Sequence, residues 1–400
     1  MNKKNMILYI GFAILMFGLG CSDALRGVFA PVFQEHFTLS ATNLSTIITI
    51  SYVGNLVFML LGGRLADGLG IRRIFTVSLL CWMGAMLLYV LTDSYYALLF
   101  GVFFAMGAST LLNMLLNIMS PILFAAPGTI INTLFFIQMM GTTLSQSVIG
   151  SLADSIFWWK LVNICMIAMG IIAILIFLPL SAGEEGLKKK VSASKPSDAK
   201  KSGGSAATDY LTLVKTPVFW LFILVFGCYF IGEHGVMNWM NIYCQDGLGL
   251  SAARASLMPS LFFGGVMVGR LVFAPLVTKF GIRETLLYTM IPGTIVYVIT
   301  FVVGGSAMYL LLAAGLGFSI VYPTMTMCIQ LFFPAEITTT ASGTILAIAT
   351  VFDILFNAVF GSIIDSVGYQ MGMMILPVAM VLCLVLYAFM IKTNKPIRMI

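Results

Sequence analysis

Six ionisable side chains lie inside long apolar runs of this sequence. They are Asp23, Arg26, Glu233, His234, Arg270 and Asp353. An ionised side chain at the centre of a bilayer costs about 2.5–3.5 kcal/mol on insertion scales, so such residues usually mark the path of a solute or a proton. These residues are therefore the first candidates for function.

Asp23 and Arg26 are three positions apart in an apolar run. In a helix this spacing places both on one face, where the two charges can neutralise each other. The pair is open to two interpretations: a structural ion pair, or a pair for which a solute or a proton competes.

A second polar group follows the string YFIGEHGVMNWMNIY at residues 229–243. His234, Asn238 and Asn241 recur on one helical face, with Glu233 and Trp239 beside them. Hydrogen-bonding groups next to aromatic rings suit a hydroxyl-rich or charged solute, and Glu233 is a candidate proton carrier. The alternative is hydrogen bonding between helices, which is common for His and Asn in membranes.

Further polar residues repeat at helical spacing within apolar runs. They are Asn113 with Asn117, Asp353 with Asn357, Gln138 with Thr142 and Gln146, and the single Asn55. Each is a candidate solute contact or a packing contact between helices. Arg270, in the string VGRL, lies near the end of its run and is better explained as a structural or gating charge that reaches the interface.

The composition identifies the elements that hold these residues. The chain has 400 residues, is 60% hydrophobic and 9% charged, and has a mean hydropathy of +1.04. A soluble domain is about 25% charged, so this composition predicts an all-α multi-pass membrane protein. Transmembrane strands are excluded because the runs are continuously apolar rather than alternating. Twelve runs approach the ~20 residues that a membrane-spanning helix needs. They cover 6–29, 43–65, 74–92, 97–120, 130–153, 158–180, 217–243, 255–277, 285–304, 307–331, 340–363 and 371–391.

Basic residues predict the orientation. Seventeen of the 21 Lys and Arg fall at the two termini, in the connections 2–3 and 8–9 and between residues 188 and 215. Cytoplasmic loops carry such an excess, so both termini are expected in the cytoplasm. The net charge of +6 needs no nucleic acid to explain it.

Seven Cys without CxxC spacing and only two His predict neither a disulfide nor a metal site, and we expect no cofactor.

The chain divides into two related halves. Residues 181–216 are rich in Lys, Ser and Gly and predict a cytoplasmic linker between six-helix bundles at 1–180 and 217–400. The halves match at a constant offset of 211: LSATN at 39–43 answers LSAAR at 250–254, and GSLAD at 150–154 answers GSIID at 361–365. Gly54 likewise answers Gly265. The offset also maps Asp23 onto His234, which favours a functional role for both.

A charged loop interrupts the apolar pattern at GGRLADGLGIRRIF, residues 62–75. It resembles the loop signature of the major facilitator superfamily. This resemblance implies two bundles that alternately open a central cavity to either side of the membrane. It also implies a cytoplasmic gate contact made by Gly63, Asp67, Gly70, Arg72 and Arg73. In the second half Thr278 replaces the Asp, so only Gly281 and Arg283 carry over.

The strings GEHGVMNW and GGVMVGRL resemble the sugar-permease branch typified by fucose permeases. The resemblance implies proton-coupled sugar uptake. Two features depart from it: the branch's first-helix carboxylate aligns with Gly27, one turn beyond Asp23, and its fourth-helix Glu is absent. A coupled proton is then expected on Asp23, Glu233 or Asp353.

The sequence favours a sugar transporter over several other functional classes. The strongest rival solute is a small organic anion paired with Arg26 or Arg270. Multidrug export is disfavoured because the fourth helix has no Arg and the fifth has no GPxxGG-like string. A sensor that binds a solute without moving it ranks lower, and no catalytic motif indicates an enzyme. The expected partners are a small-molecule solute, H+ and the lipid bilayer, with the protein acting as a monomer.

Overall fold

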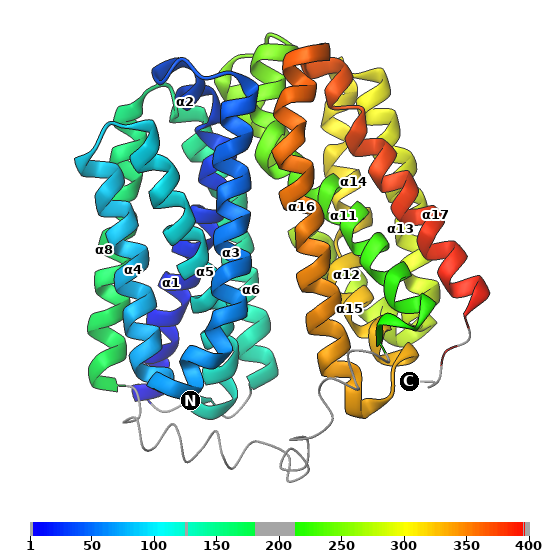
Figure 1. Ribbon diagram of the computed structural model, residues 1–400, viewed down its shortest axis with the longest axis horizontal. Coiled ribbons are helices and arrows are strands. Elements are labelled where there is room, and N and C mark those ends of the chain that lie inside the picture. Colours follow the sequence, from blue (N-terminus) through cyan, green and yellow to red (C-terminus); the bar gives the residue numbers. More distant parts are fainter. Residues whose placement is uncertain (1–2, 125–126, 181–212, 395, 397–400) are drawn as a thin grey trace. The chain divides into compact units, whose positions relative to one another are not determined.

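The computed structural model describes residues 3–124, 127–180, 213–394 and 396, with the side chains of 63–69 and a few others left out. Within these ranges the chain is helical and contains no strand. It divides into two compact units, Met1–Ala199 and Lys200–Ile400 (Figure 1). Most of the predicted linker lies outside the described residues, so the linker stays a prediction.

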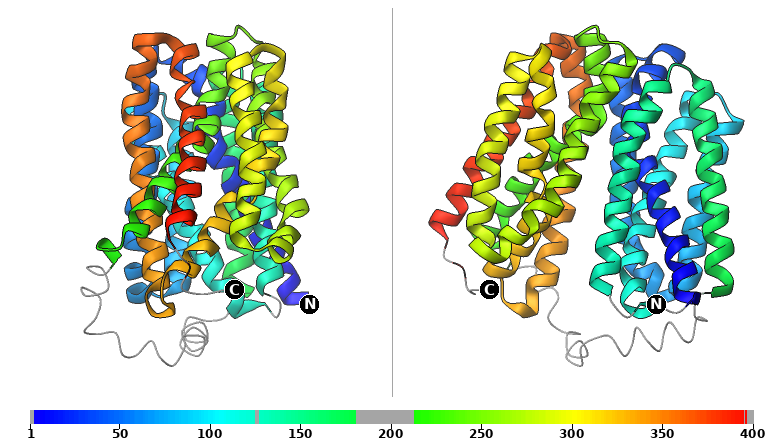
Figure 2. Two further views of the ribbon diagram at one scale, coloured as in Figure 1. Left: turned by 90° about the vertical axis from the view of Figure 1, so that its right-hand side faces the viewer. Right: turned by 180° about the vertical axis from the view of Figure 1, so that it is seen from behind.

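In unit 1, long helices lie side by side and follow one another up and down (Figures 1 and 2). The elements are α1 (Lys3–Val28), α2 (Ala30–His36), α3 (Ala41–Leu69), α4 (Ile71–Leu91), α5 (Tyr95–Leu123), α6 (Pro127–Leu144), the π-helix η1 (Ser145–Ile149), α7 (Gly150–Leu152) and α8 (Ile156–Leu180). In this unit α1 packs against α6, α8 and α5, while α3 and α4 pack against α5.

Unit 2 repeats this plan. Its elements are α11 (Pro217–Ile242), the π-helix η3 (Tyr243–Gly247), α12 (Ala252–Phe280), α13 (Ile282–Val303), the 3-10 helix η4 (Gly305–Leu310), α14 (Leu311–Phe318), α15 (Val321–Phe332), α16 (Ala335–Gly372) and α17 (Ile375–Thr393). Here α11 packs against α17, α16 and α12.

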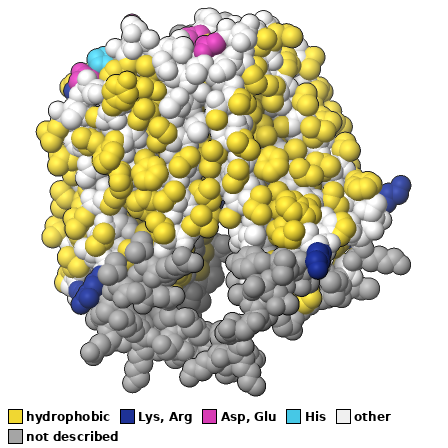
Figure 3. Space-filling model, viewed as in Figure 1, with side chains coloured by type: hydrophobic (Ala, Val, Ile, Leu, Met, Phe, Trp, Pro, Cys, Tyr) yellow, Lys and Arg dark blue, Asp and Glu magenta, His cyan; other side chains and the backbone are white. Residues whose placement is uncertain are grey.

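The helices have the length and the surface of membrane spans. Eleven of those in the described part of the chain are long and apolar enough to cross a bilayer. Large apolar side chains such as Leu91, Leu175 and Val303 are exposed, and hydrophobic side chains cover much of the face seen in Figure 3. A lipid environment tolerates such a surface, whereas water does not.

Two of the twelve predicted runs are interrupted. The run at 130–153 is divided by the π-helix η1, and the run at 307–331 breaks at residues 319–320, between α14 and α15. The second break precedes Pro323, which cannot donate a backbone hydrogen bond within a continuous helix but is tolerated in the first turn of α15. No Gly or Pro lies within residues 145–149 to indicate the first break.

The internal repeat is visible in how the second and fourth helices cross. A Cβ at Gly54 would overlap the backbone carbonyl of Phe103, and one at Gly265 would overlap that of Leu312. In both units this glycine lets two helix backbones touch (α3 on α5, α12 on α14).

The sharp turns after α3 and α12 also match. Gly70 has φ 88° and Gly281 has φ 85°, and each ends one helix and begins the next. Residues with a Cβ rarely adopt this conformation, so glycine is needed at both turns.

Candidate functional site

In unit 1 the carboxylate of Asp23 joins three helices. It projects from α1 and is half-buried. Its Oδ2 accepts a hydrogen bond from Gln138 Nε2 of α6 at 3.3 Å, and its Oδ1 accepts one from Ser109 Oγ of α5 at 3.4 Å. The structure therefore brings two predicted site residues, Asp23 and Gln138, into contact. Both donors are neutral.

Ser109 is a contact that the sequence analysis missed. It begins a row on α5 that continues, at intervals of four residues, through Asn113 and Asn117. The amide of Asn113 donates to the Ser109 carbonyl, and that of Asn117 donates to the Asn113 carbonyl. The Oδ1 atom of Asn113 is buried and makes no hydrogen bond to the described part of the chain. The i, i+4, i+8 spacing was the available signal.

The crossing of α1 and α6 fixes the position of Asp23. A Cβ at Gly20 would overlap the carbonyl oxygen of Gln138, and a Cβ at Gly141 would overlap that of Phe17. Thr142 also donates to the Gly20 carbonyl at 3.1 Å. Backbone contact thus sets the spacing between the helix of Asp23 and the helix of Gln138.

Arg26 is buried inside unit 1, with 6% of its surface exposed. Its guanidinium carbon lies 4.7 Å from the centre of the Tyr52 ring, an arrangement in which the aromatic face stabilises the cation. A small internal cavity beside it is also lined by Tyr89 and Asn163. The predicted pairing of Arg26 with Asp23 stays a prediction.

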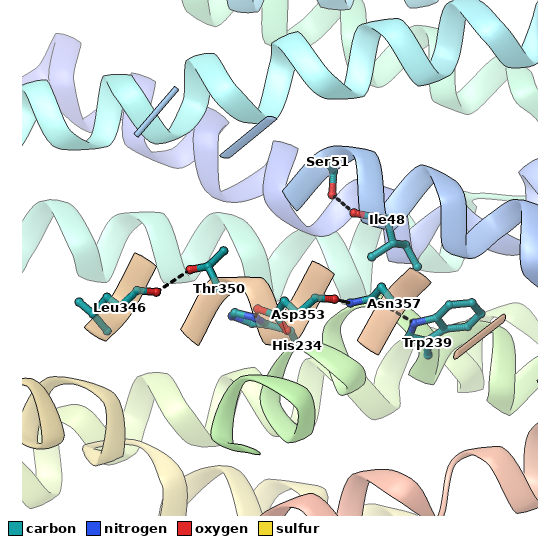
Figure 4. A network of polar contacts seen from close by, with 8 residues as sticks. All are labelled: Ile48, Ser51, His234, Trp239, Leu346, Thr350, Asp353 and Asn357. Atoms are coloured by element: carbon teal, nitrogen blue, oxygen red, sulfur yellow. Dashed lines mark hydrogen bonds and ion pairs between the residues drawn. The ribbon is translucent and has the colours of Figure 1, made fainter. Parts of the chain in front are cut away.

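In unit 2 the matching position on the first helix is His234, and its partner is another ionisable residue. His234 Nδ1 on α11 lies 2.6 Å from Asp353 Oδ2 on α16 (Figure 4). The Asp353 side chain is 1% exposed and that of His234 is 24% exposed. This buried pair was not foreseen, although both residues were predicted site residues.

A hydrogen-bonded chain extends the pair along α16. Asn357 Nδ2 donates to the Asp353 carbonyl at 2.9 Å, and Trp239 Nε1 donates to Asn357 Oδ1 at 2.9 Å (Figure 4). Trp239 is fully buried, as are Asn238 and Asn241. The indole is therefore held in place by a bond and by the Phe360 ring, 5.0 Å away.

Glu233 belongs to a different cluster from its neighbour His234. The Tyr229 phenol hydrogen-bonds the Glu233 side chain, and Arg270 of α12 acts electrostatically on Tyr229. Arg270 Nε donates to the Ser319 carbonyl at 3.2 Å. Adjacent helical residues point about 100° apart, so the two ionisable groups face different helices.

The loop arginines bind helix ends within their own units. Arg72 donates to the carbonyl of Leu178 in the last turn of α8, and Arg283 Nη2 donates to the carbonyl of Ile391 near the end of α17 at 2.7 Å. A cation there satisfies orphan carbonyls and complements the helix dipole. Arg73 is exposed. The predicted gate contacts of Gly63 and Asp67 fall where side chains lie outside the described residues.

Comparison with known proteins identifies the family. The model of the Major Facilitator Superfamily matches residues 9–352. This match covers most of the chain, and the helices and the repeat described above agree with it. The protein belongs to the Major Facilitator Superfamily, whose members are membrane transporters. No curated protein matches the chain.

Solved structures share the fold at low sequence identity. The nucleoside transporter NupG superposes with a TM-score of 0.75 at 15% identity, with 98% of this chain and 100% of that chain covered. A D-xylose-proton symporter gives 0.74 at 16% identity (98% and 97% covered). A point variant of the E. coli fucose:proton symporter FucP gives 0.64 at 17% identity (98% and 100% covered). At such identities the likeness concerns the fold.

Proposed function

We propose that the protein moves a small polar, sugar-like solute across the cell membrane by alternating access, coupled to protons. The observation that carries the proposal is the Asp23 carboxylate at membrane depth, bonded by the Gln138 amide and the Ser109 hydroxyl. Carboxylate, amide and hydroxyl groups can each exchange their present hydrogen bonds for bonds to the hydroxyls of a solute.

The structural neighbours support this solute class. Their names give xylose, fucose and nucleosides as cargo, and each of these carries a sugar ring. Two of them are proton symporters, which supports H+ as the coupling ion. Asp23, Glu233 and Asp353 are the carboxylates that we consider for the proton. We further propose that the transporter acts as a monomer with both termini in the cytoplasm.

The arrangement of the two arginines favours a sugar over an organic anion. Arg26 lies over the Tyr52 ring in unit 1, and Arg270 bonds the Ser319 carbonyl in unit 2. Each guanidinium is already held by its own bundle. An anion would have to displace these contacts, whereas a hydroxyl-rich solute would not.

Transport by purified protein in liposomes tests the proposal. The panel contains pentoses, hexoses, nucleosides, monocarboxylates and dicarboxylates, each with and without an imposed pH gradient. We expect uptake of a sugar or a nucleoside that the gradient accelerates and a protonophore abolishes. Gradient-driven uptake of carboxylates alone would replace sugar with the anion alternative, and binding without flux would indicate a sensor.

Asp23→Asn gives the residue-level test. Losing a charge-assisted hydrogen bond costs about 1.5–3 kcal/mol, so solute affinity should fall at least about tenfold. Asp154→Asn is the matched control, because Asp154 is an exposed carboxylate of the same unit. Equal solute affinity in Asp23→Asn and the wild type would remove Asp23 from the site.

A further inference from the structure

We propose that the coupled proton is held by the pair His234–Asp353 in unit 2 rather than by Glu233. This inference rests on the proposed proton-coupled transport. It selects one of three candidate carboxylates and adds His234, for which the sequence left open a solute contact or a hydrogen bond between helices.

The first argument is the setting of Asp353. Its Oδ2 meets His234 Nδ1 at 2.6 Å, while its Oδ1 is buried and has no hydrogen-bond partner in the described residues. The nearby Asn357 amide bonds the backbone carbonyl of Asp353 rather than its carboxylate. A buried carboxylate with so few donors depends on one partner for compensation. That partner is a histidine, whose charge can change in the physiological range.

The second argument is the proton balance of the pair. Imidazolium and carboxylate together carry no net charge. Release of H+ from Nε2 to water leaves a neutral imidazole, still donating through Nδ1–H to Asp353, and a net charge of −1. Uptake of H+ at Nε2 restores neutrality. The two states differ by one uncompensated charge in a buried site, which gives the proton a large influence on the packing of α11 against α16.

The third argument is access. Asp353 is closed off, but the His234 side chain is 24% exposed and offers a route for proton exchange. Its ring stacks on Phe230, with centroids 5.1 Å apart and an interplanar angle of 15°. His234 is thus the exchangeable member of the pair, and Asp353 is the buried counter-charge.

Glu233 is in a different electrostatic setting. Tyr229 hydrogen-bonds its side chain, and it lies within electrostatic range of Tyr297 and Tyr322. Arg270 is the cation of this cluster and acts electrostatically on Tyr229 and Tyr322. The hydrogen-bond partner of Glu233 is therefore a phenol, whereas that of Asp353 is a histidine, whose charge can change in the physiological range.

Other titratable groups lie on α11, on α16 and on the elements packed against them. On the packed elements they are Arg270 of α12, Tyr297 of α13, Tyr322 of α15, Asp246 of η3, Asp365 and Tyr369 of α16, and Cys383 and Tyr387 of α17. The pair His234–Asp353 joins α11 to α16 with a contact of 2.6 Å.

The transport test separates coupling from movement of the solute. With a solute identified in the liposome screen, Asp353→Asn and His234→Gln should lose accumulation driven by the pH gradient, at least about tenfold. They should retain solute exchange between the two sides, because exchange needs no net proton movement. Asp365→Asn, an exposed carboxylate on the same helix, is the matched control and should accumulate like the wild type.

Two results would overturn the assignment. One is normal gradient-driven accumulation in Asp353→Asn. The other is loss of accumulation in Glu233→Gln alone. If the wild type moves no solute at all, the proposed function fails, and the spectroscopic test that follows still decides whether the pair exchanges a proton.

The spectroscopic test uses the scarcity of histidine. The chain has only two, at 36 and 234, so the variant His36→Gln contains a single imidazole. Nitrogen-15 NMR of this histidine-labelled protein in lipid nanodiscs reports both ring nitrogens. We expect Nδ1 to stay protonated and Nε2 to change its protonation between about pH 5 and 8. An imidazole that shows no change over this range, or whose Nδ1 carries no proton, would contradict the proposal.

Discussion

The two units place different chemistry at the same position of the repeat. In unit 1, the first helix offers Asp23 to the fifth helix, where Gln138 donates at 3.3 Å. In unit 2, the first helix offers His234, and the fifth holds Asp353 at 2.6 Å. The repeat therefore preserves which helices meet at this depth and changes the residues that meet there. A carboxylate with neutral donors suits recognition of hydroxyls, and a histidine with a carboxylate suits a proton.

The same crossing also differs in how the helices approach. In unit 1, Gly141 lets α6 touch the backbone of α1. At the matching position of unit 2 stands Phe352, whose ring lies against Gly227 of α11, 2.6 Å from where a Cβ would be. A backbone contact is rigid, whereas a ring can rotate. The crossing in unit 2 is therefore the better candidate for movement when the proton state changes.

The largest effect should come from breaking the buried pair of unit 2. His234→Leu leaves the Asp353 carboxylate without its partner, so the free energy of unfolding should fall by about 3–5 kcal/mol. The double variant His234→Leu with Asp353→Leu should recover most of this loss, because no buried charge remains. Thermal unfolding in detergent measures both. If His234→Leu were as stable as the double variant, the two side chains would not be electrostatically coupled.

Alanine substitutions at the glycines of the two crossings, Gly20 in unit 1 and Gly227 in unit 2, test which crossing is the more rigid. Gly20→Ala forces α1 away from the Gln138 carbonyl and should cost about 1–3 kcal/mol of stability, partly offset by the better helix propensity of Ala. Gly227→Ala meets first the Phe352 ring, a side chain rather than a backbone, and should cost less. Unfolding midpoints of the two variants, measured side by side, give the comparison. A larger loss for Gly227→Ala would reverse our view of which crossing is rigid.

The loop arginines are where the units should behave alike. Arg72→Gln and Arg283→Gln each remove a cation from the last-turn carbonyls of α8 or α17. Each should lower the unfolding free energy by about 0.3–1 kcal/mol, with less effect at high salt. Lys215→Gln, which removes an exposed charge, is the control. If one variant lost several times more unfolding free energy than the other, the capping contacts of the two units would not be equivalent.

The smallest effect concerns a contact that unit 2 lacks. His36 Nε2 and Asp93 Oδ1 lie 2.7 Å apart with both side chains partly exposed, and the matching positions in unit 2 are Gly247 and Gly304. Exposed ion pairs contribute about 0.2–1 kcal/mol, so His36→Gln should barely change the unfolding midpoint. A loss well above this range would show that the pair matters for folding and would require another route to a single-histidine protein.

Local features of the fold were predictable, because they depend on short stretches of chain. The turns at Gly70 and Gly281 follow from the conformational freedom of glycine, and the repeat at offset 211 pointed to the matched crossings of Gly54 and Gly265. The continuous apolar runs predicted the positions of the membrane-spanning helices. The π-helix at 145–149 was not predictable, since no Gly or Pro interrupts the pattern there.

Pairings between distant residues were harder to predict. Both His234 and Asp353 were candidates, but their contact spans 119 residues and depends on the rotation of two helices about their axes. Glu233 and His234 were predicted to share one candidate site because they are neighbours in the chain. The structure separates them, since Glu233 joins Tyr229 while His234 joins Asp353. Ser109 was overlooked because its one signal was its spacing of four and eight residues from Asn113 and Asn117.

The glycine contact between α1 and α6 has a consequence for how this protein could change its cargo. The distance between the helices of Asp23 and Gln138 is set by main-chain atoms, not by the side chains that we propose as solute contacts. Residues such as Gln138 can then be exchanged for other polar types without moving the helices that present them. Selection, in nature or in the laboratory, could thus retune solute preference by single substitutions while the scaffold of the bundle stays as it is.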